Sequence, residues 1–316
     1  MTKRLSGAQF RVGLTLSSQQ TESAPEARRA EELGFDVIAT GEHLFFHVPV
    51  SNAFVALAAA AGATQRIRLL SSLTLLPLYP PALAIKMATT LDQVSNGRFD
   101  LGVGIGGEFP REFAAAGVDV HQRGSRTDEA LELMETLWSG HAVPHEGLFA
   151  DVRGLTLDPG PIQPGGPPRW LGGRSLAAMN RAGRFADVWM PYMYTPEQLA
   201  ASLVDVRNAA ERHRRDPASV RGAVFLWGAL DEDGSRSRAW AVESVSTTYR
   251  QDFSDLADRY LLHGSAEKVS RRLLEYRDAG AETFVFSPVG DGRRRQEIVD
   301  LFARDVMPIV RTGELS

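Results

Sequence analysis

Short apolar segments rich in β-branched and aromatic residues alternate along this chain with longer segments whose apolar residues recur at the helical period. This alternation is the sequence pattern of parallel βαβ units. Several candidate strands are apolar without alternation, as strands covered on both faces are. Eight candidate strands occur, at residues 10–16, 35–41, 67–76, 98–104, 168–172, 187–191, 223–230 and 283–289.

Eight βα units in succession favour a closed (β/α)8 barrel over an open doubly wound sheet. The 316 residues suit one such domain spanning residues 1–316. Glycine ends several helical segments, at Gly34, Gly97, Gly140 and Gly280, where a left-handed cap is expected. Loop insertions are predicted after the fourth strand, at 108–124, and before the fifth, in the Pro- and Gly-rich stretch 140–168.

Composition excludes several classes of function. A net charge of -4 and the absence of a basic cluster argue against nucleic acid or an anionic membrane as partner. The chain has no cysteine, which removes disulfides, thiolate metal sites and thiol nucleophiles, and only one of its seven histidines follows a predicted strand. We therefore expect no metal site, and a cytoplasmic protein that acts on a small molecule.

Residues that follow the strands of such a barrel converge on one open end, where active sites lie. Glu42 and His43 follow the second predicted strand, so a carboxylate and an imidazole are expected there. A histidine in a loop is usually a surface residue, but this position favours a catalytic role. Because neighbouring side chains alternate, we expect Glu42 to orient a neighbour or bind an arginine while His43 acts directly.

A glycine-rich segment, residues 102–107, follows the fourth strand and leads to Glu108. Its spacing matches a dinucleotide-binding fingerprint, but Pro110 and the late position in the chain argue against that interpretation. Close approach of a planar ligand to the backbone is the better explanation, which makes Gly104, Gly106 and Gly107 candidate cofactor contacts.

Gly172, Gly173, Arg174 and Ser175 follow the fifth strand and precede a helical segment at 176–185. Free backbone N–H groups at a helix start, a guanidinium and a hydroxyl together form the chemistry of a phosphate site. A plain serine N-cap after a glycine turn is the structural alternative, and the two roles are compatible.

Residues 73–104 resemble the central signature of the luciferase-like monooxygenase superfamily, and residues 112–117, 123–138 and 172–187 are similar to further parts of it. The resemblance covers residues 10–190 well and the remainder weakly. It implies a (β/α)8 barrel, usually a dimer, that holds reduced FMN or the 5-deazaflavin coenzyme F420 across the strand ends.

The resemblance also assigns site residues. The family often has an acidic residue and a histidine after strand two, here Glu42 and His43, although the deazaflavin branch commonly has Asp-His there. A non-proline cis peptide is expected near Leu73 and Thr74, which would place these two residues against the cofactor ring. A catalytic glutamate of the deazaflavin branch falls near Gly107, with Glu108 one position later.

These observations predict an oxidoreductase of the luciferase-like type. Reduced FMN would support monooxygenation and F420 would support hydride transfer, and the sequence leaves the choice open. The alternative is a non-catalytic flavin-binding barrel. An Ala-rich helix at 52–63, followed by one starting near Pro81, predicts a homodimer, because the family commonly dimerises through this region.

Overall fold

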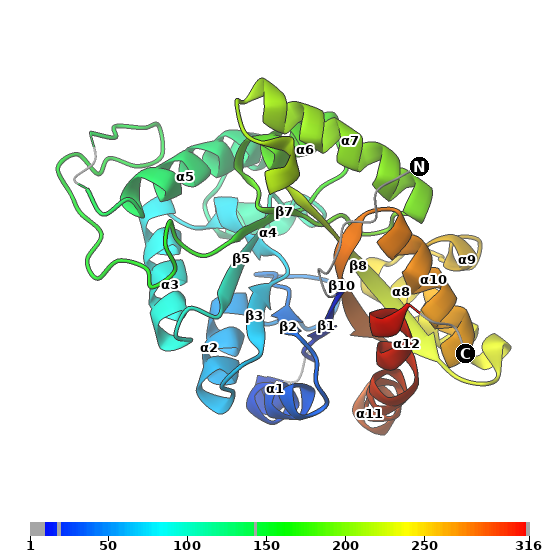
Figure 1. Ribbon diagram of the computed structural model, residues 1–316. Helices are drawn as coiled ribbons and strands as arrows, with labels where there is room; N and C mark the ends of the chain where they lie inside the picture. Colours follow the sequence, from blue (N-terminus) through cyan, green and yellow to red (C-terminus); the bar gives the residue numbers. More distant parts are fainter. Residues whose placement is uncertain (1–9, 18–19, 142–143, 314–316) are drawn as a thin grey trace.

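Eight parallel strands form a closed barrel in the computed structural model, which describes residues 10–17, 20–141 and 144–313. β10 pairs with both β8 and β1, so the sheet has no free edge between the first and last barrel strands (Figure 1). The predicted (β/α)8 fold is confirmed, and each predicted strand coincides with one barrel strand. The barrel strands are β1 (Arg11–Thr15), β2 (Val37–Thr40), β3 (Arg68–Ser71), β5 (Phe99–Gly104), β6 (Arg169–Leu171), β7 (Val188–Trp189), β8 (Arg221–Leu230) and β10 (Ala281–Pro288).

Helices surround the strands (Figure 1). They are α1 (Ser23–Glu32), α2 (Ala53–Ala63), α3 (Pro81–Val94), α4 (Pro110–Ala115), α5 (Arg123–Leu137), α6 (Leu176–Phe185), α7 (Pro196–Arg212), α8 (Gly234–Tyr249), α9 (Ala257–Tyr260), α10 (Ala266–Asp278), α11 (Gly292–Leu301) and α12 (Met307–Thr312). Short 3₁₀ segments are η1 (Gln20–Glu22), η2 (Leu76–Leu78), η3 (Val120–Gln122) and η4 (Pro217–Ser219), and η5 (Phe302–Val306) is a π-helical turn.

The glycine helix caps are confirmed. Gly34, Gly97, Gly140 and Gly280 all have positive φ angles, between +75° and +104°. Only glycine adopts this conformation without steric strain, so these residues end their helices and release the chain toward the next segment.

Two strand predictions need correction. The third predicted strand, 67–76, is interrupted: β3 ends at Ser71, and a separate β4 (Thr74–Leu75) pairs with β5. A cis peptide bond joins Ser72 to Leu73, one residue before the expected position. The second correction is β9 (Leu262–Gly264), a three-residue strand that pairs with β8 and was not predicted. Hydrophobic periodicity cannot reveal a break inside an apolar run, and it cannot reveal a strand of only three residues.

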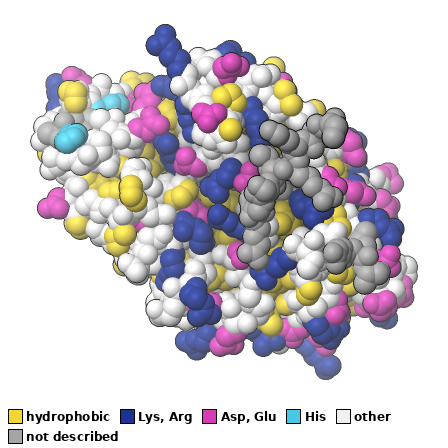
Figure 2. All heavy atoms as spheres, viewed as in Figure 1, with side chains coloured by type: hydrophobic (Ala, Val, Ile, Leu, Met, Phe, Trp, Pro, Cys, Tyr) yellow, Lys and Arg dark blue, Asp and Glu magenta, His cyan; other side chains and the backbone are white. Residues whose placement is uncertain are grey.

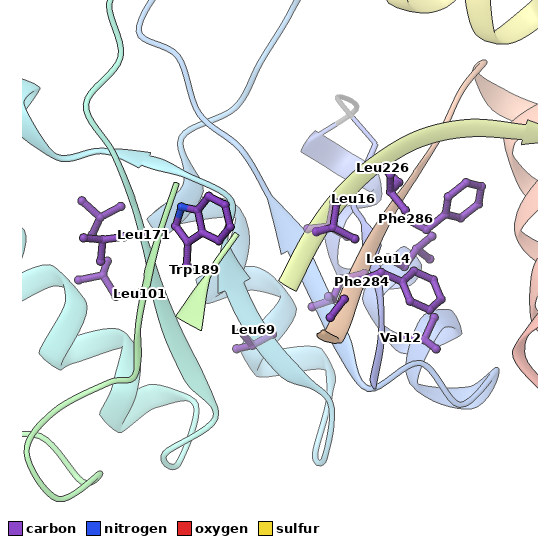
Figure 3. Packing of buried hydrophobic residues seen from close by; sticks show 14 of the residues in the cluster. Val12, Leu14, Leu16, Leu69, Leu101, Leu171, Trp189, Leu226, Phe284 and Phe286 are labelled. Atoms are coloured by element: carbon purple, nitrogen blue, oxygen red, sulfur yellow. The ribbon is translucent and has the colours of Figure 1, made fainter. Parts of the chain in front are cut away.

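Apolar side chains form two layers because residues on each strand alternate in direction. Val37, Ala39, Leu70, Trp170, Val188, Met190, Ala223 and Val285 form a small cluster inside the barrel. Their neighbours along the strands point outward and pack beneath the helices. Figure 3 shows part of this outer layer, with Leu14 near Phe284 and Phe286 of β10. Among the described residues, no helix is both long enough and apolar enough to cross a membrane.

Candidate active site

A cavity of about 1080 Å³ opens at the end of the barrel where the strands finish. Its walls come from segments that follow β1, β2, β3, β5, β6, β7, β8 and β10. α4, which follows β5, lies on the far side of the molecule in Figure 1, so the end of the barrel where the strands finish faces away from the viewer. Strand-end loops thus converge here as the sequence predicts.

A second cavity, of about 580 Å³, lies at the opposite end of the barrel, among the first residues of the strands. It contains an ion pair between Arg68 Nη2 and Asp100 Oδ1 at 2.5 Å, with Arg11 and Arg221 nearby. Burial raises the pKa of Asp100, and Arg68 opposes that effect. Figure 2 shows this end of the molecule, where arginine and lysine side chains gather around the centre. In barrels this end serves stability, so we place the chemistry in the first cavity.

His43 lies on the cavity wall, and Glu112 of α4 holds it in place. Its Nδ1 is 3.1 Å from Glu112 Oε1 and 3.2 Å from Oε2, and Leu44 N–H donates to Oε2 at 3.1 Å. The Glu112 side chain is 0% exposed and that of His43 is 15% exposed. Since Nδ1 faces the carboxylate, Nε2 is the ring nitrogen available to a ligand.

The Glu42 carboxylate has a structural role: it is hydrogen-bonded to neighbouring segments rather than to His43. Its buried carboxylate accepts hydrogen bonds from Ala53 N–H at 3.1 Å, Leu75 N–H at 2.9 Å, Tyr79 Oη at 3.0 Å and Asn52 Nδ2 at 3.3 Å. Burial raises its pKa despite these donors. Glu42 therefore joins the loop after β2 to the start of α2 and to β4. It does orient neighbours, as expected, but none of these four partners is an arginine.

Glu108, the third predicted catalytic residue, is exposed at the cavity rim and bonds to Tyr192 rather than to His43. Tyr192 Oη donates to Glu108 Oε1 at 2.6 Å, and the guanidinium carbon of Arg174 lies 5.1 Å from the Tyr192 ring centroid. Burial and the nearby Glu108 carboxylate raise the pKa of Tyr192, which keeps its phenol protonated. Tyr192 is thus a hydrogen-bond donor at the rim.

Glycines after β5 and β6 make room for the protein's own side chains as well as for a ligand. Leu73 forms part of the cavity floor, and a Cβ atom on Gly172 would overlap its side chain. On Gly104 the added atom would lie 3.3 Å from Leu73 Cβ, and on Gly106 3.1 Å from the Phe113 ring. Gly104 and Gly172 therefore leave the space that Leu73 occupies, and Gly106 leaves space for Phe113.

Two predicted cofactor contacts lie outside the cavity lining. Gly107, with φ of +114°, packs against the Arg123 side chain, where a Cβ atom would lie 3.1 Å from Nε. Thr74 is fully buried within β4, whereas Ser72 and Leu73 reach the cavity. Gly104, Gly106 and Leu73 are the predicted contacts of this group that line it.

Gly172, Gly173, Arg174 and Ser175 all line the cavity at the start of α6. Gly172 N–H already donates to Val103 O at 3.3 Å, whereas the N–H groups of Gly173 and Arg174 have no recorded hydrogen bond to a described residue. Ser175 caps α6 by accepting from Ala178 N–H at 3.2 Å, which leaves its own hydroxyl proton to donate. This loop therefore offers donors to an anion, and the expected serine N-cap of α6 is present.

A flavin-type group fits these residues. Leu73, Val103, Leu171 and Met190 provide an apolar floor suited to a planar ring, and the start of α6 provides donors suited to a phosphate. Arg181, which also lines the cavity, adds positive charge at that end while it pairs with Asp128.

Sequence reasoning missed Glu112 as the partner of His43, and it missed the aromatic side chains of the cavity. Glu112 is 69 residues from His43 along the chain, and only the folded loop after β5 brings them together. One sequence signal exists in retrospect: Glu112 precedes Phe113 on a short amphipathic segment, and both face inward. Among the described residues, no group of three or more potential metal ligands occurs.

Comparison with known proteins agrees with the fold and with the sequence resemblance. A model of the luciferase-like monooxygenase family matches residues 6–283. An uncharacterised protein of Mycobacterium tuberculosis is 34% identical over 206 residues, which are 65% of this chain and 70% of that protein. An F420-dependent secondary alcohol dehydrogenase in complex with an F420–acetone adduct has a TM-score of 0.84 at 22% identity, over 96% of this chain and 99% of its own.

A type II Baeyer–Villiger monooxygenase of Pseudomonas putida in complex with FMN has a TM-score of 0.75 at 21% identity, over 95% of this chain and 98% of its own. At these identities the solved structures establish the barrel. The family model extends over most of the sequence, so this chain belongs to the luciferase-like monooxygenase family.

Proposed function

We propose that this protein is an oxidoreductase that uses reduced FMN or coenzyme F420 on a small organic substrate. The observation that carries the proposal is the pair of His43 and Glu112 on the wall of a cavity whose other parts suit a flavin-type ring and its phosphate. Structures of similar fold contain F420 in one case and FMN in another, which supports both cofactors.

Leu73, Gly104 and Gly106 would hold the ring, and Gly173, Arg174 and Ser175 would hold the phosphate. When bound, reduced FMN would activate molecular oxygen, whereas reduced F420 would supply a hydride and be oxidised by two electrons. Glu112 fixes the orientation of His43, so that Nε2 can give or take a proton at the substrate. The Tyr192 hydroxyl already donates its proton to Glu108, so at the rim its oxygen remains as an acceptor.

Titration of the purified protein with FMN and with F420, followed by fluorescence quenching, tests the proposal. Binding of either cofactor, followed by turnover of its reduced form, supports it. Oxygen uptake during turnover would identify monooxygenation, and cofactor oxidation without oxygen uptake would identify hydride transfer. Binding without turnover over a broad substrate panel would support the non-catalytic flavin-binding alternative, and absence of binding would refute both.

The proposal includes a homodimer formed through α2 and α3. Along the outer face of α2 the exposed residues are Val55, Ala58, Ala59 and Gly62, and none of them is charged. Small exposed residues let two helices approach closely. We expect Ala59→Arg to shift the sedimentation coefficient from dimer to monomer. Val204→Arg, at an exposed apolar residue of α7, is the matched control and should leave it unchanged.

A native protein that sediments as a monomer at micromolar concentration would contradict the dimer. A cytoplasmic location and the absence of a nucleic-acid partner stay predictions, for cell fractionation and for a binding assay with DNA and RNA.

A further inference from the structure

Aromatic side chains form one wall of the main cavity, around His43. We call Phe46, Tyr192, Phe225, Trp227 and Tyr249 the aromatic wall, since all five line the cavity. They come from the loop after β2, the segment after β7, the middle of β8 and the end of α8. Neither the predicted ring contacts nor the predicted phosphate contacts include any of them, so the wall is a separate feature of the site.

The aromatic wall is packed tightly enough to keep its shape. The Phe46 ring stacks on the His43 imidazole with centroids 4.0 Å apart and an interplanar angle of 14°. Phe46 also meets the Tyr249 ring edge to face at 6.3 Å, and Tyr249 stacks with Tyr192 at the same distance. Burial raises the pKa of Tyr249 to about 12, so its phenol stays neutral. The aromatic wall is therefore uncharged and preformed.

Within the part of the chain that the structure describes, four arginines line the cavity, and each has a hydrogen-bond or ion-pair partner. Arg29 pairs with Asp300 at 2.5 Å and Arg181 with Asp128 at 2.5 Å. Arg174 donates to Met193 O at 3.2 Å and lies over the Tyr192 ring. The buried Arg295 donates to two carbonyl oxygens, Pro288 O and Thr15 O. Arg29 and Arg181 are thus paired with carboxylates, whereas Arg174 and Arg295 bond to carbonyl oxygens, and Arg174 and Arg181 lie at the end assigned to the cofactor's phosphate.

We propose that the aromatic wall selects a substrate whose reacting carbonyl or hydroxyl group is attached to a neutral, apolar ring. This inference rests on the proposed function and specifies its substrate class. Burial of an apolar ring against aromatic faces is favourable, whereas an uncompensated carboxylate or phosphate next to them is strongly unfavourable. The reacting group would meet His43 Nε2, and the ring would lie against Phe46 and Trp227.

The test compares three small ligands by calorimetric titration, on the protein alone and on the protein loaded with FMN or F420. Cyclohexanone is a neutral apolar ring, cyclohexanecarboxylate is the same ring with a negative charge, and glucose is a neutral polar ring. Cyclohexanone should bind at least about tenfold more tightly than either of the others. Equal or tighter binding of the carboxylate or of glucose would overturn the proposal.

Two variants test whether the aromatic wall is the surface that binds cyclohexanone. Trp227→Ala should weaken cyclohexanone binding by about three- to tenfold, because an aromatic contact is lost. Trp240→Ala, at a tryptophan of α8 outside the cavity, is the matched control and should change nothing. Equal losses in the two variants would overturn the assignment to the wall.

Phe46→Arg provides a second test if Trp227→Ala fails to fold. Phe46 is half-buried in an irregular segment, so its substitution should disturb the barrel less. The new cation should weaken cyclohexanone binding and strengthen cyclohexanecarboxylate binding, thereby reversing the order of the two affinities. An unchanged order would overturn the proposal. Cofactor binding is measured separately, so failure of the proposed function shows as absent FMN and F420 binding, whereas failure of this inference shows in the ligand order alone.

Discussion

Glu112→Gln tests whether the buried carboxylate positions His43 for proton transfer. Glutamine keeps the shape of the side chain and one oxygen, which can still accept from Leu44 N–H. The other carboxylate oxygen becomes an NH2 group, which would donate to His43 Nδ1 instead of accepting from it. The proton of the neutral imidazole would then move to Nε2, the nitrogen that faces the ligand. Glu112→Gln therefore changes the tautomer while it conserves the packing.

The expected size of the effect follows from the loss of the charge-assisted hydrogen bond between His43 Nδ1 and the Glu112 carboxylate. A hydrogen bond to a charged group contributes about 1.5–3 kcal/mol, and 1.4 kcal/mol corresponds to a tenfold change in rate. The rate of turnover should therefore fall by roughly 10- to 150-fold, with the Michaelis constant changed by a few-fold at most. The ¹⁵N NMR shifts of His43 should report the new tautomer, which a purely structural role of Glu112 would not alter.

Glu129→Gln is the matched control. Glu129 also accepts backbone hydrogen bonds, from Leu148, Phe149 and Ala150, but it lies outside the cavity lining. It should lower the melting temperature without changing turnover per folded molecule. The reasoning would be refuted if Glu112→Gln turned over at the native rate with the native tautomer, or if Glu129→Gln lost as much activity.

His43→Ala should lower turnover by about 10² to 10⁴ and leave cofactor affinity within a few-fold, and a variant that melts earlier but turns over normally would contradict the catalytic role. Gly173→Asp should weaken cofactor binding about tenfold or more in a fluorescence titration, through repulsion of the phosphate. Since a Cβ atom there lies 2.6 Å from Ala178 Cβ, Gly173→Ala is its control, and equal losses would exclude a charge effect. Burial and the nearby Lys268 lower the pKa of His263 in the folded protein. Neutral His263 therefore contributes fully to the stability of the folded state above the unfolded pKa near 6.5, and this contribution is lost as pH falls toward the folded pKa. The melting temperature should thus fall more steeply from pH 7 to pH 5 in the native protein than in His263→Gln, and parallel curves would rule this out.

The barrel could be predicted because its strands and helix ends are marked by short patterns of neighbouring residues in the sequence. Each strand is an apolar run between turn residues, and glycines such as Gly34 and Gly280 mark the helix ends by a backbone conformation that few other residues adopt. β9 could not be predicted, because a three-residue strand is defined by the strand it pairs with, here β8. The break at Ser72 and Leu73 lies inside an apolar run, where periodicity carries no signal.

The candidate site could be predicted only in part, for the same reason. The strand-end rule brought His43 and the loop from Gly172 to Ser175 to the cavity, because it depends on chain order alone. The partner of each side chain depends on tertiary contacts. Glu42 follows β2, but its carboxylate accepts hydrogen bonds from α2 and β4. His43 is instead bonded to Glu112, which comes from the segment after β5.

The pairing of β1 with β10 also sets the order in which this chain can complete its fold during synthesis. β1 ends at Thr15 and its partner ends at Pro288, so one edge of β1 has no partner until nearly the whole chain has left the ribosome. At about 5–20 residues per second this interval lasts roughly 15 to 55 seconds. An unpaired strand edge is a template for intermolecular association, so the nascent chain is most prone to aggregate before its last strand emerges.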